Sequence, residues 1–158
     1  MRADSRTMVG SGPYIWGGYA EDVCALTRTE EPLRSPQTPL LTEAARQLAA
    51  YFDGARTDFD LPLRTRGTAF RERCWAALRE IPYGRTVTYG EQARRIGNPG
   101  AARAVGGANH DNPIMIVIPC HRVVGADGSL TGFGGGLDMK AWLLGHERAV
   151  LEGRMHHA

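Results

Sequence analysis

The chain has 158 residues and a mass of 17.2 kDa, and 42% of its residues are hydrophobic and 23% charged. This balance is typical of a globular protein and excludes a wholly disordered chain, a collagen and a coiled-coil rod. No apolar run suits a transmembrane helix and the first residues do not resemble a signal peptide, so we expect a cytoplasmic protein without a membrane partner.

The net charge of +2 conceals an uneven distribution along the chain. Residues 64–109 hold nine Arg and three acidic residues, which gives this stretch a charge of +6. Residues 1–63 carry a charge of −3 and residues 110–158 a charge of −1. A basic middle between near-neutral flanks fits a local anionic partner or a solvated surface, and charge alone does not choose between them.

The chain before residue 65 gives the fewest structural signals. Residues 14–16 and 23–26 are predicted to pair as a short hairpin. Apolar residues at helical spacing predict a helix over residues 41–52, which Asp53-Gly54 would end. The alternating residues 59–63 predict an edge strand, in which a proline is tolerated.

After residue 65 an apolar stripe at helical spacing predicts a helix that begins after Thr68 and ends before Pro82. Cys74 lies on that stripe, so we expect a packed, unreactive thiol, and we expect the same of Cys24. The chain has three cysteines and no Cys-x-x-Cys pair. An odd count without such pairs argues against a disulfide framework and against a structural zinc site.

Two short helices around a tight turn are predicted in the most basic stretch. Thr88 followed by Glu91 is a capping box, and it predicts a helix that ends at Gly97. Residues 98–100 form the turn and residues 101–108 the second helix. This outline is that of a helix-turn-helix, although such pairs are also common packing units.

The second helix of this pair consists almost entirely of Ala and Gly, with Arg103 as its one long side chain. A helix that reads the major groove carries several long polar side chains, whereas a smooth helix with one cation suits the minor groove. The alternative is a small-residue helix packed against a neighbour.

Residues 114–118 read as a buried strand, and Cys120 follows it directly. Because His121 and Arg122 come next, the pKa of the Cys120 thiol is expected to fall toward that of a reactive thiolate. Adjacent side chains seldom face each other, so we expect a water molecule to join Cys120 and His121. Glu147 lies on or beside an apolar helix face, where a buried carboxylate needs a partner and His121 is suited; the alternative is a residue at the rim of the helix. The chain Glu147–His121–water–Cys120 would then activate the thiol as in a protease triad.

Several short motifs follow one another between residues 65 and 152. They are Ile81-Pro82-Tyr83-Gly84, Thr88-Tyr89-Gly90, Ala102-Arg103-Ala104-Val105-Gly106, Asn112-Pro113, Pro119-Cys120-His121-Arg122-Val123 and Gly134-Gly135-Gly136. Together they resemble the O6-alkylguanine-DNA alkyltransferases, or methylated-DNA–protein-cysteine methyltransferases. The resemblance is weaker over residues 11–63, where the N-terminal segment is short.

The resemblance implies an α+β fold with two parts. Residues 1–64 would form a small N-terminal sheet-and-helix lobe of the methyltransferase ribonuclease-like type. Residues 65–153 would form a mainly helical DNA-binding and catalytic domain with the helix-turn-helix and a short active-site strand.

The resemblance also implies a role for each matching residue. Cys120 would accept an alkyl group from guanine O6 in a single turnover, with His121 as base and Glu147 as its support. Asn112 would brace the turn before the active strand. Tyr89 would rotate the phosphate of the target nucleotide and donate a proton to the departing guanine.

Other matching residues are implied to contact DNA. Arg103 would fill the gap left by a flipped base, which costs a few kcal/mol to extrude. The DNA-binding set is Tyr89, Gly90, Asn98, Ala102, Arg103 and Ala126, and the guanine pocket comprises Phe133, Val123, Gly134 and Pro119. The implied partner is double-stranded DNA containing O6-alkylguanine, with O4-alkylthymine as a further candidate. We expect no cofactor or metal, a monomer, and association with the nucleoid if the chain is bacterial.

Two residues depart from the family pattern. Phe133 stands where the family commonly has Tyr, and Asp111 adds a negative charge near the edge that would face DNA. Three alternatives remain open on the sequence. The first is a lesion-binding protein that transfers no alkyl group, against which Cys120 argues. The second is a helix-turn-helix regulator with a structural cysteine, and the third is a cysteine hydrolase, for which no oxyanion-hole motif is present.

Overall fold

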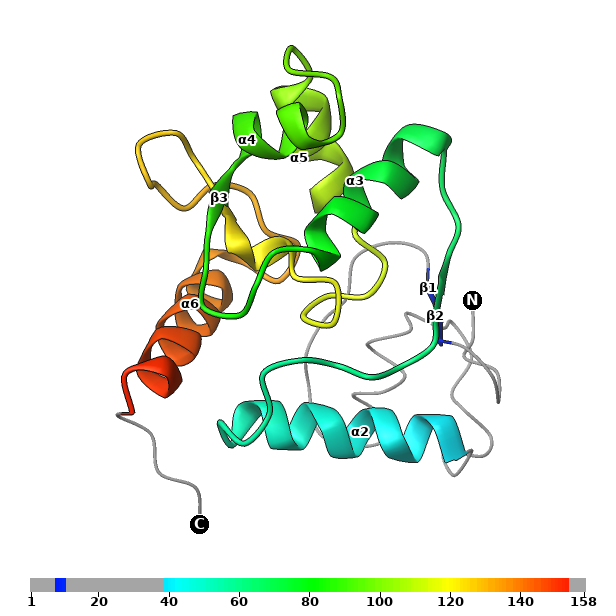
Figure 1. Cartoon of the computed structure of the whole chain (residues 1–158), viewed down its shortest axis with the longest axis vertical. Coiled ribbons are helices and arrows are strands. Elements are labelled where there is room, and N and C mark those ends of the chain that lie inside the picture. Colours follow the sequence, from blue (N-terminus) through cyan, green and yellow to red (C-terminus); the bar gives the residue numbers. More distant parts are fainter. Residues whose placement is uncertain (1–7, 11–38, 154–158) are drawn as a thin grey trace.

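The computed structural model describes residues 8–10 and 39–153, which form an α+β fold (Figure 1). Its helices are α2 (Pro39–Phe52), α3 (Ala69–Arg79), α4 (Tyr89–Arg95), α5 (Ala102–His110) and α6 (Leu137–Leu151), with a 3-10 turn at Cys120–Arg122. Its strands are β1 (Met8–Gly10), β2 (Leu63–Thr65), β3 (Val87–Thr88) and β4 (Val123–Val124). In Figure 1, α3, α4 and α5 gather at one end of the molecule and α2 lies across the other.

Two short parallel strand pairs hold the described elements in register. β1 pairs with β2, and β3 pairs with β4, so that Val87 lies opposite Val123 and Thr88 opposite Val124. The second pair matters for function because β3 leads into α4 while β4 directly follows the turn that carries Cys120. It therefore fixes the start of α4 beside the cysteine.

The predicted helix signals are confirmed. The Thr68 hydroxyl accepts a hydrogen bond from the backbone of Arg71 at 3.2 Å, and the Thr88 hydroxyl accepts one from Glu91 at 3.1 Å. Each bond satisfies a backbone donor that a helix start leaves free. Just beyond α4, Gly97 adopts a φ of 80°, a left-handed conformation that glycine takes without steric cost.

The strand predicted at residues 59–63 is wrong in position, because the described strand β2 begins only at Leu63. The Gln47 side chain accepts from the Asp60 backbone N–H at 2.9 Å and donates to its carbonyl at 3.0 Å. The backbone of this segment is therefore bonded to α2 rather than to a neighbouring strand. The hairpin predicted over residues 14–26 and Cys24 lie outside the described residues.

The strand predicted at residues 114–118 is also wrong, although all five residues are buried as expected. The segment is a turn in which Ile116 has a φ of 73°, a costly conformation for a β-branched residue. The Asn112 side chain closes the turn, accepting from the Ile114 N–H at 3.0 Å and donating to the Ile118 carbonyl at 2.7 Å. Asn112 thus braces this turn directly before Cys120.

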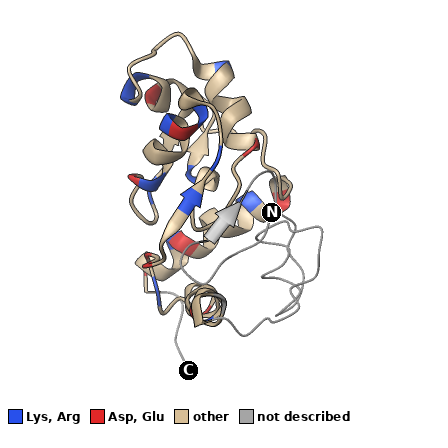
Figure 2. Ribbon diagram, turned by 90° about the vertical axis from the view of Figure 1, so that its right-hand side faces the viewer, with Lys and Arg blue, Asp and Glu red and all other residues tan. Residues whose placement is uncertain are grey.

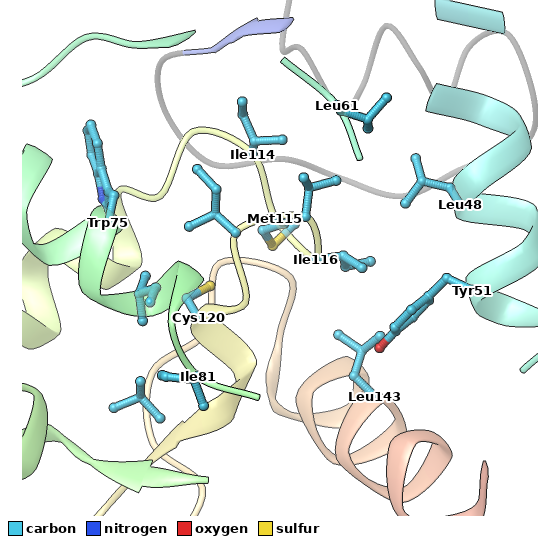
Figure 3. Packing of buried hydrophobic residues seen from close by; sticks show 14 of the residues in the cluster. Leu48, Tyr51, Leu61, Trp75, Ile81, Ile114, Met115, Ile116, Cys120 and Leu143 are labelled. Carbon is cyan, nitrogen blue, oxygen red and sulfur yellow. The ribbon is translucent and has the colours of Figure 1, made fainter. Parts of the chain in front are cut away.

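The described residues form one large and one small apolar cluster. The large cluster joins α2, the 114–118 turn, Cys120 and α6 (Figure 3). The small one packs the three helices at the other end together, and it contains Cys74, Ala93, Val105 and Ala108. Cys74 is fully buried and burial raises the pKa of its thiol, as expected for a packed, unreactive cysteine. Among the described helices, none has the length and apolar character of a membrane span.

Candidate active site

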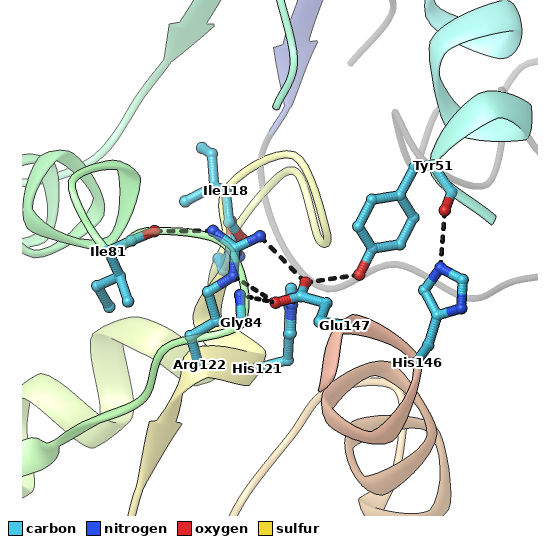
Figure 4. Close-up of polar contacts among 9 residues, drawn as sticks. Tyr51, Ile81, Gly84, Ile118, His121, Arg122, His146 and Glu147 are labelled. Atoms are coloured by element: carbon cyan, nitrogen blue, oxygen red, sulfur yellow. Dashed lines mark hydrogen bonds and ion pairs between the residues drawn. The ribbon is translucent and has the colours of Figure 1, made fainter. Parts of the chain in front are cut away.

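The Glu147 carboxylate lies at the centre of a buried polar cluster (Figure 4). Its Oε2 accepts hydrogen bonds from His121 Nε2 at 2.6 Å, the Tyr51 hydroxyl at 2.7 Å and Arg122 Nη2 at 3.0 Å. Its Oε1 accepts from the Gly84 N–H and from Arg122 Nε, both at 2.9 Å. A carboxylate without solvent access is tolerated only when it is paired and hydrogen-bonded in this way.

The protonation states of this cluster follow from its contacts. Burial raises the pKa of Glu147, but hydrogen bonds and charges from His121 and Arg122 outweigh it, and the pKa lies far below its ordinary value. Burial lowers the pKa of His121 despite the opposing effect of Glu147, so the imidazole is neutral. Because an ionised carboxylate only accepts, Nε2 of His121 carries the proton and Nδ1 keeps its lone pair. Nδ1 is buried and has no hydrogen-bond partner among the described residues.

Cys120 begins the 3-10 turn and has only 5% of its surface exposed. Burial raises the pKa of its thiol to about 11, although Asn112 and the charge of Lys140 oppose this rise. The expectation that neighbouring His121 and Arg122 would lower this pKa is wrong. His121 is neutral, and the Arg122 guanidinium bonds to Glu147 and to the Ile81 carbonyl, so neither residue supplies a free positive charge to the sulfur.

Tyr89, Thr131 and Lys140 form a second polar group near the cysteine. The Tyr89 hydroxyl donates to the Thr131 carbonyl at 2.9 Å, and Lys140 Nζ donates to the same carbonyl at 2.9 Å and lies 3.5 Å from the Tyr89 oxygen. Lys140 is fully buried, and within the described part of the chain no carboxylate lies within ion-pair distance of its Nζ. Burial lowers the pKa of Lys140, and the charge of Cys120 raises it.

Helices α4 and α5 form the predicted helix-turn-helix. A reciprocal amide pair between Gln92 and Asn109 (2.7 and 3.0 Å) fixes their relative orientation, and the Trp75 indole of α3 donates to the Ala108 carbonyl at 2.8 Å. Arg103 is exposed on α5, as are the small residues Ala104 and Gly107. Figure 2 shows Arg residues with interspersed carboxylates over this end of the molecule.

Three of the remaining residues expected to contact DNA lie in the helix pair, and the fourth lies in the turn after β4. Asn98 is exposed in the turn between α4 and α5, Ala102 is half-buried at the start of α5, and Gly90 is half-buried at the start of α4. Ala126 is exposed in the turn that the bond from Gly125 N–H to Ser129 carbonyl closes at 2.8 Å.

Two of the four residues expected to line a guanine pocket, Pro119 and Val123, flank the 3-10 turn that Cys120 begins. Val123 and Phe133 belong to the same buried cluster as the cysteine, Pro119 is buried directly before it, and Gly134 is half-buried. Asp111, the departure from the family pattern, pairs with Arg71 at 2.6 Å. Its charge is therefore partly neutralised at the C-terminal end of α5, away from the helix start near Arg103.

Three residues of these clusters, Tyr51, Gly84 and Lys140, were given no role from the sequence, and Arg122 was expected beside the thiol but bonds to Glu147. Lys140 falls on the same helical stripe as Leu143 and Glu147, which is a signal that could have found it. Gly84 has a φ of 74°, and a Cβ there would meet the Leu151 side chain. Tyr51 is separated from Glu147 by 96 positions, and no local pattern indicates their contact.

Comparisons with known proteins show the family to which the chain belongs. The model of the 6-O-methylguanine DNA methyltransferase DNA-binding domain matches residues 69–149, and that of the ribonuclease-like domain of the same family matches residues 19–65. A methylated-DNA–protein-cysteine methyltransferase of Mycolicibacterium paratuberculosis is 56% identical over 145 residues, which are 90% of this chain and 85% of the relative.

Solved structures of O6-methylguanine methyltransferases are also similar to this chain. The O6-methylguanine methyltransferase of Mycobacterium tuberculosis aligns with a TM-score of 0.68 and 54% identity, covering 79% of this chain and 78% of that one. A structure of the M. tuberculosis protein in complex with DNA aligns with a TM-score of 0.69 and 56% identity, covering 70% of this chain and 68% of that one.

The described fold and these matches define an α+β protein with a helical DNA-binding domain. The chain belongs to the 6-O-methylguanine DNA methyltransferase family, an enzyme family of DNA repair by alkyl transfer. The resemblance found in the sequence and the predicted fold class are thereby confirmed. Among the described residues, no group of three or more His, Cys, Asp or Glu side chains could hold a metal ion.

Proposed function

We propose that this protein repairs O6-alkylguanine in double-stranded DNA by moving the alkyl group to its own Cys120 in a single turnover. The observation that carries the proposal is a buried thiol followed directly in the chain by a neutral His121, whose imidazole is held by an ionised Glu147. A buried neutral thiol needs a base when it reacts, and His121 Nδ1 is the unbonded lone pair that is available on the adjacent residue.

The transfer step balances without a cofactor. The Cys120 thiol proton passes through a water molecule to His121 Nδ1, and the resulting imidazolium is stabilised by Glu147. The sulfur forms a bond to the alkyl carbon while the bond from that carbon to guanine O6 breaks. The electron pair of the broken bond moves to the guanine, which takes a proton from the Tyr89 hydroxyl. The imidazolium then releases its proton to solvent and the tyrosinate takes one up, so both residues return to their neutral forms. The thioether persists, so each molecule reacts once.

We further propose that the target nucleotide is flipped out of the duplex when α5 binds the minor groove. The surface of α5 supports this proposal because it exposes Arg103 among small residues that allow close approach. Arg103 would stack in the gap and offset part of the cost of unstacking. Tyr89 is suited to rotate the phosphate because its ring lies against Gly106 of α5 while its hydroxyl lies at Thr131.

The decisive experiment mixes the protein with a duplex that contains one O6-methylguanine and measures intact and peptide masses. We expect the protein to gain the mass of one methyl group, located on Cys120, and the duplex to lose it. Parallel duplexes with O6-ethylguanine and O4-methylthymine test the wider substrate range. Methyl transfer to another residue, or none, would contradict the proposal.

A second candidate function is lesion binding without transfer. The observation that favours it is the pKa of Cys120, which burial raises to about 11 and which makes the resting thiol a weak nucleophile. Selective retention of the methylated duplex with no mass gain would support this second function.

A further inference from the structure

One donor to the Glu147 carboxylate comes from the N-terminal part of the chain. Tyr51 belongs to α2, within the segment that matches the ribonuclease-like domain, whereas Glu147 lies in the segment that matches the DNA-binding domain. The Tyr51 hydroxyl bonds to Oε2, the same oxygen that receives the bond from His121. Figure 4 shows the tyrosine reaching from α2 toward the carboxylate.

Tyr51 is fixed at both ends. Its backbone carbonyl accepts a hydrogen bond from His146 Nε2 at 2.7 Å, and His146 is the residue before Glu147 on α6. Its side chain is fully buried, and its ring packs edge-on against Tyr83 with the centroids 6.0 Å apart. The position of the hydroxyl is therefore set by packing, and the carboxylate must lie where the hydroxyl can reach it.

We propose that Tyr51 is a positioning residue for alkyl transfer, which ties the Glu147 carboxylate to α2 and so keeps it aligned with the His121 imidazole. The inference rests on the proposed transfer to Cys120. It adds that the N-terminal part of the chain takes part in the reaction, beyond any role in folding.

The hydroxyl also affects the basicity of His121. The groups that face His121 are Glu147, which raises its pKa, and Arg122 and Lys140, whose charges lower it. A phenol that donates to Oε2 withdraws negative charge from the contact with His121. Removing the hydroxyl leaves Glu147 a stronger stabiliser of the imidazolium, so the pKa of His121 rises. Methyl transfer requires neutral His121. When the Tyr51 hydroxyl is removed, the increase of the transfer rate with pH should therefore occur at higher pH.

The test compares Tyr51→Phe with Tyr83→Phe. Both changes remove one phenol hydroxyl and keep the ring, but the Tyr83 hydroxyl has no hydrogen-bond partner among the described residues. The probe is a duplex with one O6-methylguanine at saturating concentration, and the readout is the rate constant of methyl uptake from about pH 5 to pH 9.

We expect Tyr51→Phe to lower the rate constant roughly tenfold, as the loss of one hydrogen bond to a charged group would. We also expect its pH midpoint to lie above that of the wild type. Tyr83→Phe should match the wild type in both respects.

The single turnover separates folding from positioning. The final fraction of methylated protein counts the competent molecules, while the rate constant reports how fast those molecules react. If Tyr51→Phe lowers only the fraction, or matches Tyr83→Phe in rate constant and midpoint, the inference is overturned. Absence of methyl uptake by the wild type would instead refute the proposed function.

Discussion

Two groups of the candidate site, the Glu147 carboxylate and the Cys120 thiol, are both buried but have opposite polar surroundings. Glu147 receives hydrogen bonds from five donor atoms and stays ionised. Cys120 has no comparable set of donors, and burial raises the pKa of its thiol. The difference separates a permanent charge, which the fold must stabilise in advance, from a nucleophile that acquires charge only when it reacts.

The largest effect is expected when the Cys120 thiol is removed. Cys120→Ala should abolish methyl uptake completely while keeping affinity for the methylated duplex, because the helix-turn-helix is unchanged. Mass spectrometry and an electrophoretic mobility shift measure the two properties on the same sample. Normal uptake by this variant would remove Cys120 from the reaction. Cys74→Ala is the matched control, because that buried thiol lies in the small cluster and should not affect uptake.

The next largest effect is expected when the charge of the Glu147 carboxylate is removed. In Glu147→Gln the buried Arg122 loses its counter-ion, and breaking a buried pair costs about 3–5 kcal/mol of unfolding free energy. Denaturant unfolding of the wild type and the variant at neutral pH measures this difference. A loss under about 1 kcal/mol would contradict the view that this cluster stabilises the fold.

The same pair of proteins tests the pH dependence. Because the pKa of Glu147 is lowered on folding, its contribution is complete above the ordinary carboxyl pKa and is lost as the pH falls toward the folded-state pKa. The wild type should therefore lose stability on acidification below about pH 4.5, and Glu147→Gln should lose less. Parallel stability curves for the two proteins would show that Glu147 does not titrate in this way.

A smaller effect is expected at Lys140, the buried cation near the nucleophile. Lys140→Met keeps the length of the side chain but removes the bond to the Thr131 carbonyl and the charge near Cys120. The rate of methyl uptake at saturating duplex should fall roughly tenfold or more, because a hydrogen bond from a charged group contributes about 1.5–3 kcal/mol. Lys140→Arg, which keeps the charge, should retain more activity than the Met variant.

A substitution at Arg103 should affect the interface with DNA rather than the transfer reaction. Arg103→Ala should slow uptake from duplex DNA by about tenfold and leave uptake from the free base O6-methylguanine unchanged, because only the duplex has a gap to fill. Arg148→Ala, an exposed arginine on α6, is the control for loss of one positive charge. Equal losses of the uptake rate in both variants would show that Arg103 does not fill a gap in the duplex.

The smallest effect concerns Asp111. Both side chains of its pair with Arg71 are more than a third exposed, so the pair contributes roughly 0.2–1 kcal/mol. Asp111→Asn should leave stability nearly unchanged and tighten duplex binding by about threefold or less at low salt, with the difference vanishing as salt increases. Weaker binding by the variant would show that the pair, rather than the charge, matters.

Local signals in the sequence were enough to predict the described helices and one contact of the candidate site. The caps at Thr68 and Thr88 were predicted because a helix start needs acceptors within three residues, and such contacts can be read from spacing alone. The pairing of Glu147 with His121 was also predicted, because a carboxylate on an apolar helix face needs a partner and the motif supplied one.

Only the tertiary structure decided the features that depend on distant contacts. A run of apolar residues at 114–118 cannot distinguish a buried strand from a buried turn, and the side chain of Asn112 selected the turn. The pKa of Cys120 depends on how deeply the sulfur is buried and on where its neighbours point. Tyr51 reaches Glu147 from a helix far away in the chain, and spacing along a sequence carries no information about such a contact, which packing alone brings about.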